Sequence, residues 1–134
     1  MSLLETKFIP KGWGYEKWLV NKDEYCGKLL FFAKDKQCSL HYHKLKDETF
    51  YVHKGAVEMH YSDDLKAIER DMEINGSDDW RNLATLKIEV LLPGDVFPVP
   101  RGRVHRVVAL EDTEVFEFST EHFDSDSYRL LKGD

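Results

Sequence analysis

The chain has 134 residues, enough for one domain of ordinary size. It carries 19 basic and 25 acidic residues, so its net charge is −6, and a broad basic surface for nucleic acid or anionic lipid is not expected. No apolar run is long enough to cross a membrane and no signal-peptide pattern opens the chain, so we expect a cytoplasmic protein that binds neither nucleic acid nor membrane.

Apolar and polar residues alternate with a period of two along most of the chain, and the 3.6-residue period of long helices is nearly absent. This alternation predicts short strands separated by turns that hold most of the glycines and prolines. The expected strands cover residues 15–20, 28–33, 37–43, 48–53, 57–61, 86–92, 96–99, 103–110 and 114–120. Many short strands with turns between them predict an all-β fold, either an antiparallel sandwich or a barrel.

One stretch, residues 62–84, interrupts this pattern because it is acidic and irregular. Within it, Leu65, Ile68 and Met72 have the spacing of one face of a helix. We therefore expect a single domain over residues 1–134, with an inserted loop at about 62–84 that lies over the barrel and has room for one short helix. The two cysteines are too few for a disulfide scaffold and are expected to be free thiols.

Three histidines and one glutamate have the spacing of a metal site. His41 and His43 are two positions apart on an expected strand, so both side chains leave the same face. Glu48 opens the next strand after a short polar turn, which brings its carboxylate back toward the histidine pair. His105 follows a second turn later in the chain. Three imidazoles and a carboxylate suit one divalent transition metal ion, namely Mn, Fe, Zn, Co or Ni, better than calcium or magnesium.

The order of these residues resembles the two sequence motifs of the cupin superfamily. The first motif is matched by His41-Tyr42-His43, four residues, Glu48, six residues and Gly55. The second is matched by Gly94, five residues, Pro100-Arg101-Gly102, two residues and His105. The chain departs from the usual motifs at Asp35, where the first motif opens with glycine, and at Ala109, where the second closes with asparagine. Neither position is a ligand. Without the glycine, the turn before residues 37–43 is expected to have a different backbone conformation.

The resemblance implies a cupin-type double-stranded β-helix, that is, a jelly-roll barrel with a metal ion near its mouth. In this sequence the ion would be held by His41, His43, Glu48 and His105. The resemblance also implies a homodimer, because cupin barrels commonly pair through an N-terminal strand.

Two further segments resemble the cupin domain of type II phosphomannose isomerases and of small sugar-pathway cupins. They are the Trp13-Gly14-Tyr15-Glu16 entry to the first expected strand and the Val104-His105-Arg106 run. This resemblance implies a small-molecule ligand, a sugar or sugar phosphate, and an isomerase or epimerase related to mannose-6-phosphate isomerase. The candidate substrate-binding residues are two cations near the expected mouth and two rings: Arg101, Arg103, Tyr51 and Phe50. The sequence identifies no catalytic residue.

Two other functions fit the same motifs. One is a non-haem iron cupin dioxygenase, because some cupins with three histidines and one glutamate oxidise their substrates. The other is a non-catalytic cupin that binds a metabolite. Metal content and substrate-dependent oxygen uptake separate the oxygenase from the other two.

Overall fold

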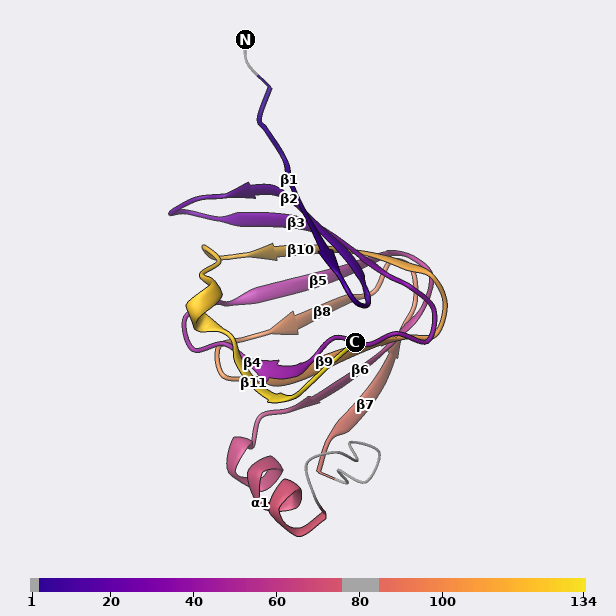
Figure 1. Ribbon diagram of the computed structural model, residues 1–134, viewed down its shortest axis with the longest axis vertical. Coiled ribbons are helices and arrows are strands. Elements are labelled where there is room, and N and C mark those ends of the chain that lie inside the picture. The colour runs from indigo at the N-terminus through magenta and orange to yellow at the C-terminus, as the bar shows by residue number, and fades with distance from the viewer. Residues whose placement is uncertain (1–2, 76–84) are drawn as a thin grey trace.

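The computed structural model describes residues 3–75 and 85–134, which form two antiparallel sheets packed face to face (Figure 1). The first sheet has six strands in an order that does not follow the sequence. From one edge to the other, these are β1 (Lys7–Lys11), β2 (Gly14–Asn21), β3 (Cys26–Phe32), β10 (Thr113–Ser119), β5 (Glu48–Lys54) and β8 (Val96–Val99).

The second sheet has five strands. Its order is β11 (Tyr128–Leu131), β4 (Leu40–Tyr42), β9 (Val104–Ala109), β6 (Val57–Ser62) and β7 (Lys87–Leu91). The predicted all-β, jelly-roll fold is therefore confirmed. The sequence pattern did not predict β1 and β11, which are edge strands. β1 contains Pro10 and is largely exposed, so it lacks the alternation of a half-buried strand.

Strand β4 is the shortest of the described strands and is weakly paired with β9. A strand over residues 37–43 is predicted, but only Leu40–Tyr42 has strand structure. Its pairing with β9 consists of a single residue pair, His41 opposite His105. Ahead of it, the chain is attached to β9 by the Cys38 N–H, which donates to the Val107 carbonyl at 3.2 Å.

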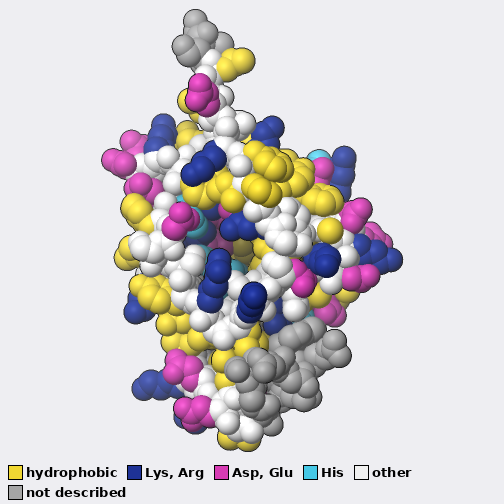
Figure 2. Space-filling model, in the orientation of Figure 1, with side chains coloured by type: hydrophobic (Ala, Val, Ile, Leu, Met, Phe, Trp, Pro, Cys, Tyr) yellow, Lys and Arg dark blue, Asp and Glu magenta, His cyan; other side chains and the backbone are white. Residues whose placement is uncertain are grey.

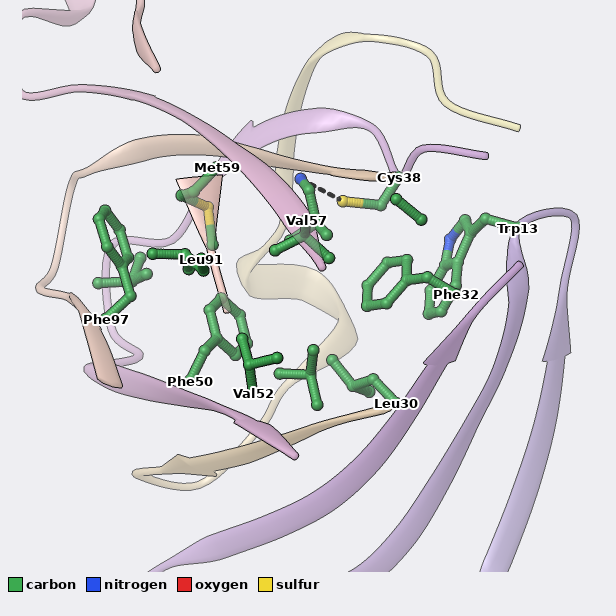
Figure 3. Packing of buried hydrophobic residues seen from close by; sticks show 14 residues of the cluster. Trp13, Leu30, Phe32, Cys38, Phe50, Val52, Val57, Met59, Leu91 and Phe97 are labelled. Carbon is green, nitrogen blue, oxygen red and sulfur yellow. Dashed lines mark hydrogen bonds between the residues drawn. The ribbon is translucent and has the colours of Figure 1, made fainter. Parts of the chain in front are cut away.

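The main core lies between the two sheets and is made of the inward-facing residues of both (Figure 3). Trp13 stacks on Phe32 with ring centroids 4.3 Å apart. The Cys38 thiol lies in this core and accepts a hydrogen bond from the Val107 N–H at 3.3 Å. Both Cys38 and Cys26 are free and buried.

A second, smaller core covers the outer face of the five-stranded sheet. Helix α1 (Leu65–Asn75) supplies Ile68, which is fully buried against Leu40, Val104 and Leu131. The helical spacing in the expected insertion thus corresponds to a real helix, and its apolar face is what holds the segment on the sheet. The rest of the expected insertion, residues 76–84, lies outside the described residues. Within the described part, no helix has the length and apolar character needed to cross a membrane.

The two departures from the usual motifs contact each other: Asp35 lies in the turn before β4, and Ala109 is the last residue of β9. Asp35 has a φ of 68°, in the left-handed region that glycine enters without strain and aspartate tolerates better than most residues. Its N–H donates to the Ala109 carbonyl at 2.9 Å. An aspartate in place of the glycine therefore still permits a left-handed turn here.

Candidate metal centre

A cavity of about 530 Å³ lies between the two sheets and is lined by residues of both. Its lining includes Lys11 of β1 and Arg129 of β11, the edge strands of the two sheets. Figure 2 shows a hollow on this face in which histidine side chains are visible, with Lys and Arg side chains beside it. The volume is within the range of small-molecule sites.

Three histidines meet in this cavity. His41 comes from β4, His43 directly follows the end of β4, and His105 comes from β9; all three line the cavity. One ring nitrogen from each lies within 4.8 Å of the others. His41 and His105 are directly opposite each other in the sheet. His43 is two positions beyond His41, just past the end of β4, and its side chain projects from the same face into the cavity.

Main-chain hydrogen bonds orient each of the three rings. Each Nδ1–H donates to a backbone carbonyl: that of Ser39 for His41 at 2.8 Å, of Asp126 for His43 at 2.9 Å, and of Arg103 for His105 at 3.0 Å. With the proton on Nδ1, the Nε2 lone pair is free for a metal ion, which is the usual arrangement of ligand histidines.

The fit of a metal ion rests on this geometry. The Nε2 atom of His105 is buried and has no hydrogen-bond partner, an arrangement that costs free energy unless something else binds the nitrogen. A divalent ion would satisfy all three nitrogens at once. The donor set of three imidazoles and a nearby carboxylate matches ions of borderline hardness.

Glu48 supplies the carboxylate, and it comes from the opposite sheet. Its Oε2 lies 3.2 Å from Nε2 of His43, and its Oε1 lies 3.7 Å from Nε2 of His105. Glu48 is 3% exposed, so its charge is shielded from water. The structure therefore brings together all four residues that the motif spacing singled out, with β5 contributing one and the five-stranded sheet contributing three.

Sequence reasoning missed a second set of buried charges beside this site. Lys46 Nζ lies 3.3 Å from Oε2 of Glu48 and 3.1 Å from Oε2 of Glu117. Deeper in the first sheet, Lys28 Nζ lies 3.5 Å from Glu16 Oε1. The signal was in the alternation: Lys28 shares the inward face of β3 with Leu30 and Phe32, and Glu117 shares that of β10 with Val115. Charged residues at inward positions predict a polar cavity.

Burial shifts the pKa values of these groups in opposite directions. It lowers the pKa of His41 to about 4 and that of His43 to about 3, and it holds the pKa of His105 well below its ordinary value, so all three rings are neutral at pH 7. Burial, followed by the charge of Glu117, raises the pKa of Glu48. Burial alone would raise the pKa of Glu117, but the positive charges of Lys46 and Lys28 have a larger effect, so this pKa lies below its ordinary value.

These shifts predict that the metal-free protein loses stability in mild acid. Unfolded histidines titrate near 6.5 and folded His41 near 4, so between these values the unfolded chain binds more protons and stability falls as the pH drops. The raised pKa of Glu48 has the opposite effect and offsets part of the contribution of the three histidines. We expect a net loss of about 3 kcal/mol between pH 6.5 and pH 5, measured by urea unfolding with a chelator present.

A variant pair identifies the source of this pH dependence. His105→Gln removes one buried imidazole and is expected to reduce the loss, whereas His53→Gln changes an imidazole that is 46% exposed and is expected to leave it unchanged. Equal or higher stability of the metal-free wild type at pH 5 would contradict the prediction.

Asp126 holds the β4–β5 turn, which lies between His43 and Glu48. Its carboxylate accepts hydrogen bonds from the backbone N–H groups of Lys44, Leu45 and Lys46 at 2.9 to 3.2 Å. Its own carbonyl accepts the Nδ1–H of His43. Asp126 lies in a short 3-10 helix (Asp124–Asp126) and is 3% exposed, so one buried residue fixes both a histidine ring and the turn.

We therefore expect Asp126→Ala to destabilise the protein by about 3 kcal/mol, because three N–H donors lose a charged acceptor. Urea unfolding of the metal-free protein measures the change. Asp124→Ala is the matched control, since the Asp124 side chain is 90% exposed and is expected to contribute less than about 0.5 kcal/mol. Similar losses in the two variants would contradict the role of Asp126.

The predicted substrate-binding residues have different positions. Phe50 lines the cavity, and its ring centroid lies 6.1 Å from that of His105. Tyr51 is the next residue of β5, so its side chain leaves the opposite face of the sheet. Tyr51, Arg101 and Arg103 are not among the described residues that line the cavity.

Both arginines are engaged elsewhere. Arg103 donates two hydrogen bonds to the Asp63 carboxylate, at 2.8 and 3.0 Å, and Arg101 donates to the Leu45 carbonyl at 2.8 Å. The assignment of Arg101 and Arg103 to a phosphate near the metal is therefore not supported by their positions. Arg103 instead contributes to the site through its main-chain carbonyl, which accepts the Nδ1–H of His105.

Gly102 connects the second motif to the first. It has a φ of 86°, which favours glycine, and its N–H donates to the His43 carbonyl at 2.7 Å. The turn that leads into β9 and His105 is thereby attached directly to the main chain of His43.

The sequence model of the cupin family matches residues 28–129, a segment that contains all four of these side chains and both motif turns. The chain is a cupin. A comparison with curated protein sequences gives no match.

Solved structures share the fold at low sequence identity. The capsular polysaccharide assembling protein CapF from Staphylococcus aureus is 18% identical with a TM-score of 0.69, and the match covers 96% of this cupin and 33% of CapF. KdgF from Halomonas sp. is 21% identical with a TM-score of 0.60, covering 83% and 81%. Oxalate decarboxylase from Bacillus subtilis is 17% identical with a TM-score of 0.71, covering 97% and 31%. This cupin thus spans about a third of the CapF and oxalate decarboxylase chains.

Proposed function

We propose that this cupin binds one divalent transition metal ion through His41, His43, His105 and Glu48, and that it isomerises or epimerises a sugar or sugar phosphate in the cavity above the ion. The observation that carries the proposal is the presentation of three unprotonated Nε2 atoms and a carboxylate to a cavity of about 530 Å³. The structures it resembles support the proposal, because one is a capsular polysaccharide assembling protein and another, oxalate decarboxylase, has Mn(II) centres.

The ion would act as a Lewis acid that polarises a carbonyl or hydroxyl oxygen of the ligand. An isomerase also needs a group that accepts a proton from carbon. Glu117 and His122 are the candidates, because both line the cavity and both contact Lys46. Two hydrogen bonds hold the His122 ring, one from Lys46 Nζ to its Nδ1 at 3.2 Å and one from its Nε2–H to Asp124 Oδ1 at 2.9 Å. Both ring nitrogens are thus engaged, so His122 acts as a base only after Lys46 Nζ releases its Nδ1.

Aromatic rings and hydrogen-bonding groups make the wall suitable for a sugar. Trp13, Trp18 and Phe50 line the cavity and offer faces or edges against which a sugar ring packs. Buried Lys46 and Glu117 offer a donor and acceptors for hydroxyl groups. Walls of rings with a few fixed polar groups are typical of small-molecule sites.

The test combines metal analysis with ligand binding. Protein purified without chelator is analysed for metal, loaded to one ion per chain, and titrated calorimetrically with mannose, mannose 6-phosphate and fructose 6-phosphate. Proton exchange at carbon 2 of bound sugars, followed by NMR in deuterated water, measures isomerase chemistry. Failure to load one ion, or loading with no sugar binding, would contradict the proposal. The same donor set holds iron, so iron with substrate-dependent oxygen uptake would favour the dioxygenase.

The homodimer and the cytoplasmic location stay predictions, as does the relationship to phosphomannose isomerases. Sedimentation of the purified protein at several concentrations tests the dimer.

A further inference from the structure

Four basic and four acidic side chains line the cavity among the described residues. The basic ones are Lys11, Lys28, Lys46 and Arg129. The acidic ones are Glu16, Glu48, Glu117 and Asp124. The wall is therefore balanced, although the chain as a whole has a net charge of −6. A divalent ion adds two positive charges to this wall, so a cavity loaded with metal attracts anions despite the acidic surface around it.

The buried charges are already paired with one another. Lys28 pairs with Glu16, and Lys46 lies between Glu48 and Glu117. Two cations are left, Lys11 and Arg129, and neither forms an ion pair with any residue in the described part of the chain.

Arg129 is placed next to the metal site by the register of the sheet. It lies directly opposite His41 in the pairing of β11 with β4. Directly opposed residues project their side chains to the same face, about 5 Å apart at Cβ, so Arg129 shares the cavity face of His41. Burial is the main cause of the lowered pKa of His41, and the charges of Lys46 and Arg129 add to it, which agrees with this proximity.

Lys11 reaches the same opening from the other sheet. It belongs to edge strand β1, whereas Arg129 belongs to edge strand β11, and both line the one cavity. Lys and Arg side chains are visible beside the hollow in Figure 2. The rim therefore has an unpaired cation on each sheet, and the guanidinium offers the planar pair of donors that oxyanions bind.

We infer that the ligand of this cavity carries an oxyanion, a carboxylate or a phosphate, and that Arg129, with Lys11 opposite, binds that group at the rim while the rest of the ligand faces the metal site. This inference rests on the proposed function, because it assigns one end of the same ligand. Arg129 and Lys11, on the edge strands, thus replace Arg101 and Arg103 as the candidate anion-binding residues.

The experiment uses the full chain loaded with Zn(II) and three probes that share one sugar ring: glucose, glucuronate and glucose 6-phosphate. Calorimetry gives the affinity for each. We expect both anions to bind at least about tenfold more tightly than glucose, with the stronger of the two identifying the oxyanion. Arg129→Gln is expected to weaken anion binding about tenfold and to leave glucose unchanged, and Lys11→Gln combined with it is expected to abolish the preference.

Arg101→Gln is the matched control, since Arg101 is also an exposed arginine but is not part of the cavity lining, and it is expected to leave all three affinities unchanged. Equal binding of glucose and the two anions, or anion binding that Arg129→Gln does not alter, would overturn this inference while leaving the proposed function intact. Loading of Zn(II) with no binding of any probe would overturn both.

Discussion

Replacing His105 by alanine is expected to lower the affinity of the protein for Zn(II) or Mn(II) by more than about 100-fold. The change removes one of three nitrogens that lie within 4.8 Å of one another, and the ring it removes is on β9, whereas the other two are on β4 and just past its end. The remaining ligands on β4 and β5 then surround the ion on fewer sides. Competition with a chromophoric chelator measures the affinity of wild type and variant.

Two further variants test the register of strand β5. Glu48 lies at the buried start of the strand, and His53 is an odd number of positions away, so its side chain faces the other side. Glu48→Ala is expected to weaken metal binding at least about tenfold, whereas His53→Ala is expected to have no effect. Equal losses in the two variants would show that the ion is not held where the three histidines and Glu48 meet.

The second large effect concerns stability. Lys46→Met is expected to destabilise the metal-free protein by about 3 to 5 kcal/mol, because it leaves the carboxylates of Glu48 and Glu117 buried without their shared cation. Lys46 is 3% exposed, so its ammonium group is the main source of screening for the two carboxylates. Urea unfolding in the presence of a chelator gives the free energy of unfolding.

Lys44→Met is the matched control within the same turn. Lys44 Nζ lies 4.4 Å from the centroid of the Tyr128 ring at the surface, so its loss is expected to cost less than about 1 kcal/mol. Adding Glu117→Gln to Lys46→Met removes one of the stranded charges and is expected to restore part of the lost stability. A small effect of Lys46→Met, or no recovery in the double variant, would contradict the pairing.

The fold and the meeting of the four candidate ligands could be predicted from the sequence because both depend on local patterns. Alternation identified the central strands, whose inward faces are buried, such as β3 and β10. It failed for β1, which contains Pro10 and is largely exposed, and for β11, in which only Leu131 is buried, because neither has a clear alternation to detect. The spacing of His41, His43, Glu48 and His105 identified the candidate ligands, because the short turns between strands fix which side chains meet.

The rim of the cavity could not be predicted in the same way. Arg101 and Arg103 are close to His105 in sequence, but neither lines the cavity, and Arg103 pairs with Asp63 instead. Arg129 is 24 positions beyond His105, yet the unpredicted strand β11 places it opposite His41. Side chains that reach a site through tertiary pairing of edge strands leave no local signal in the sequence.

The short strand β4 has a consequence for the dynamics of the molecule. It carries His41 and leads directly into His43, yet it has only three residues and a single residue pair connects it to β9. Its other edge pairs with edge strand β11 across an irregular register, so few main-chain hydrogen bonds on the β9 side oppose its local opening. An ion bound by β4, β9 and β5 would cross-link the two sheets at this weak point. Amide hydrogen exchange at Leu40 to Tyr42 would then slow markedly on metal loading, while exchange in the well-paired strands β3 and β10 would change little.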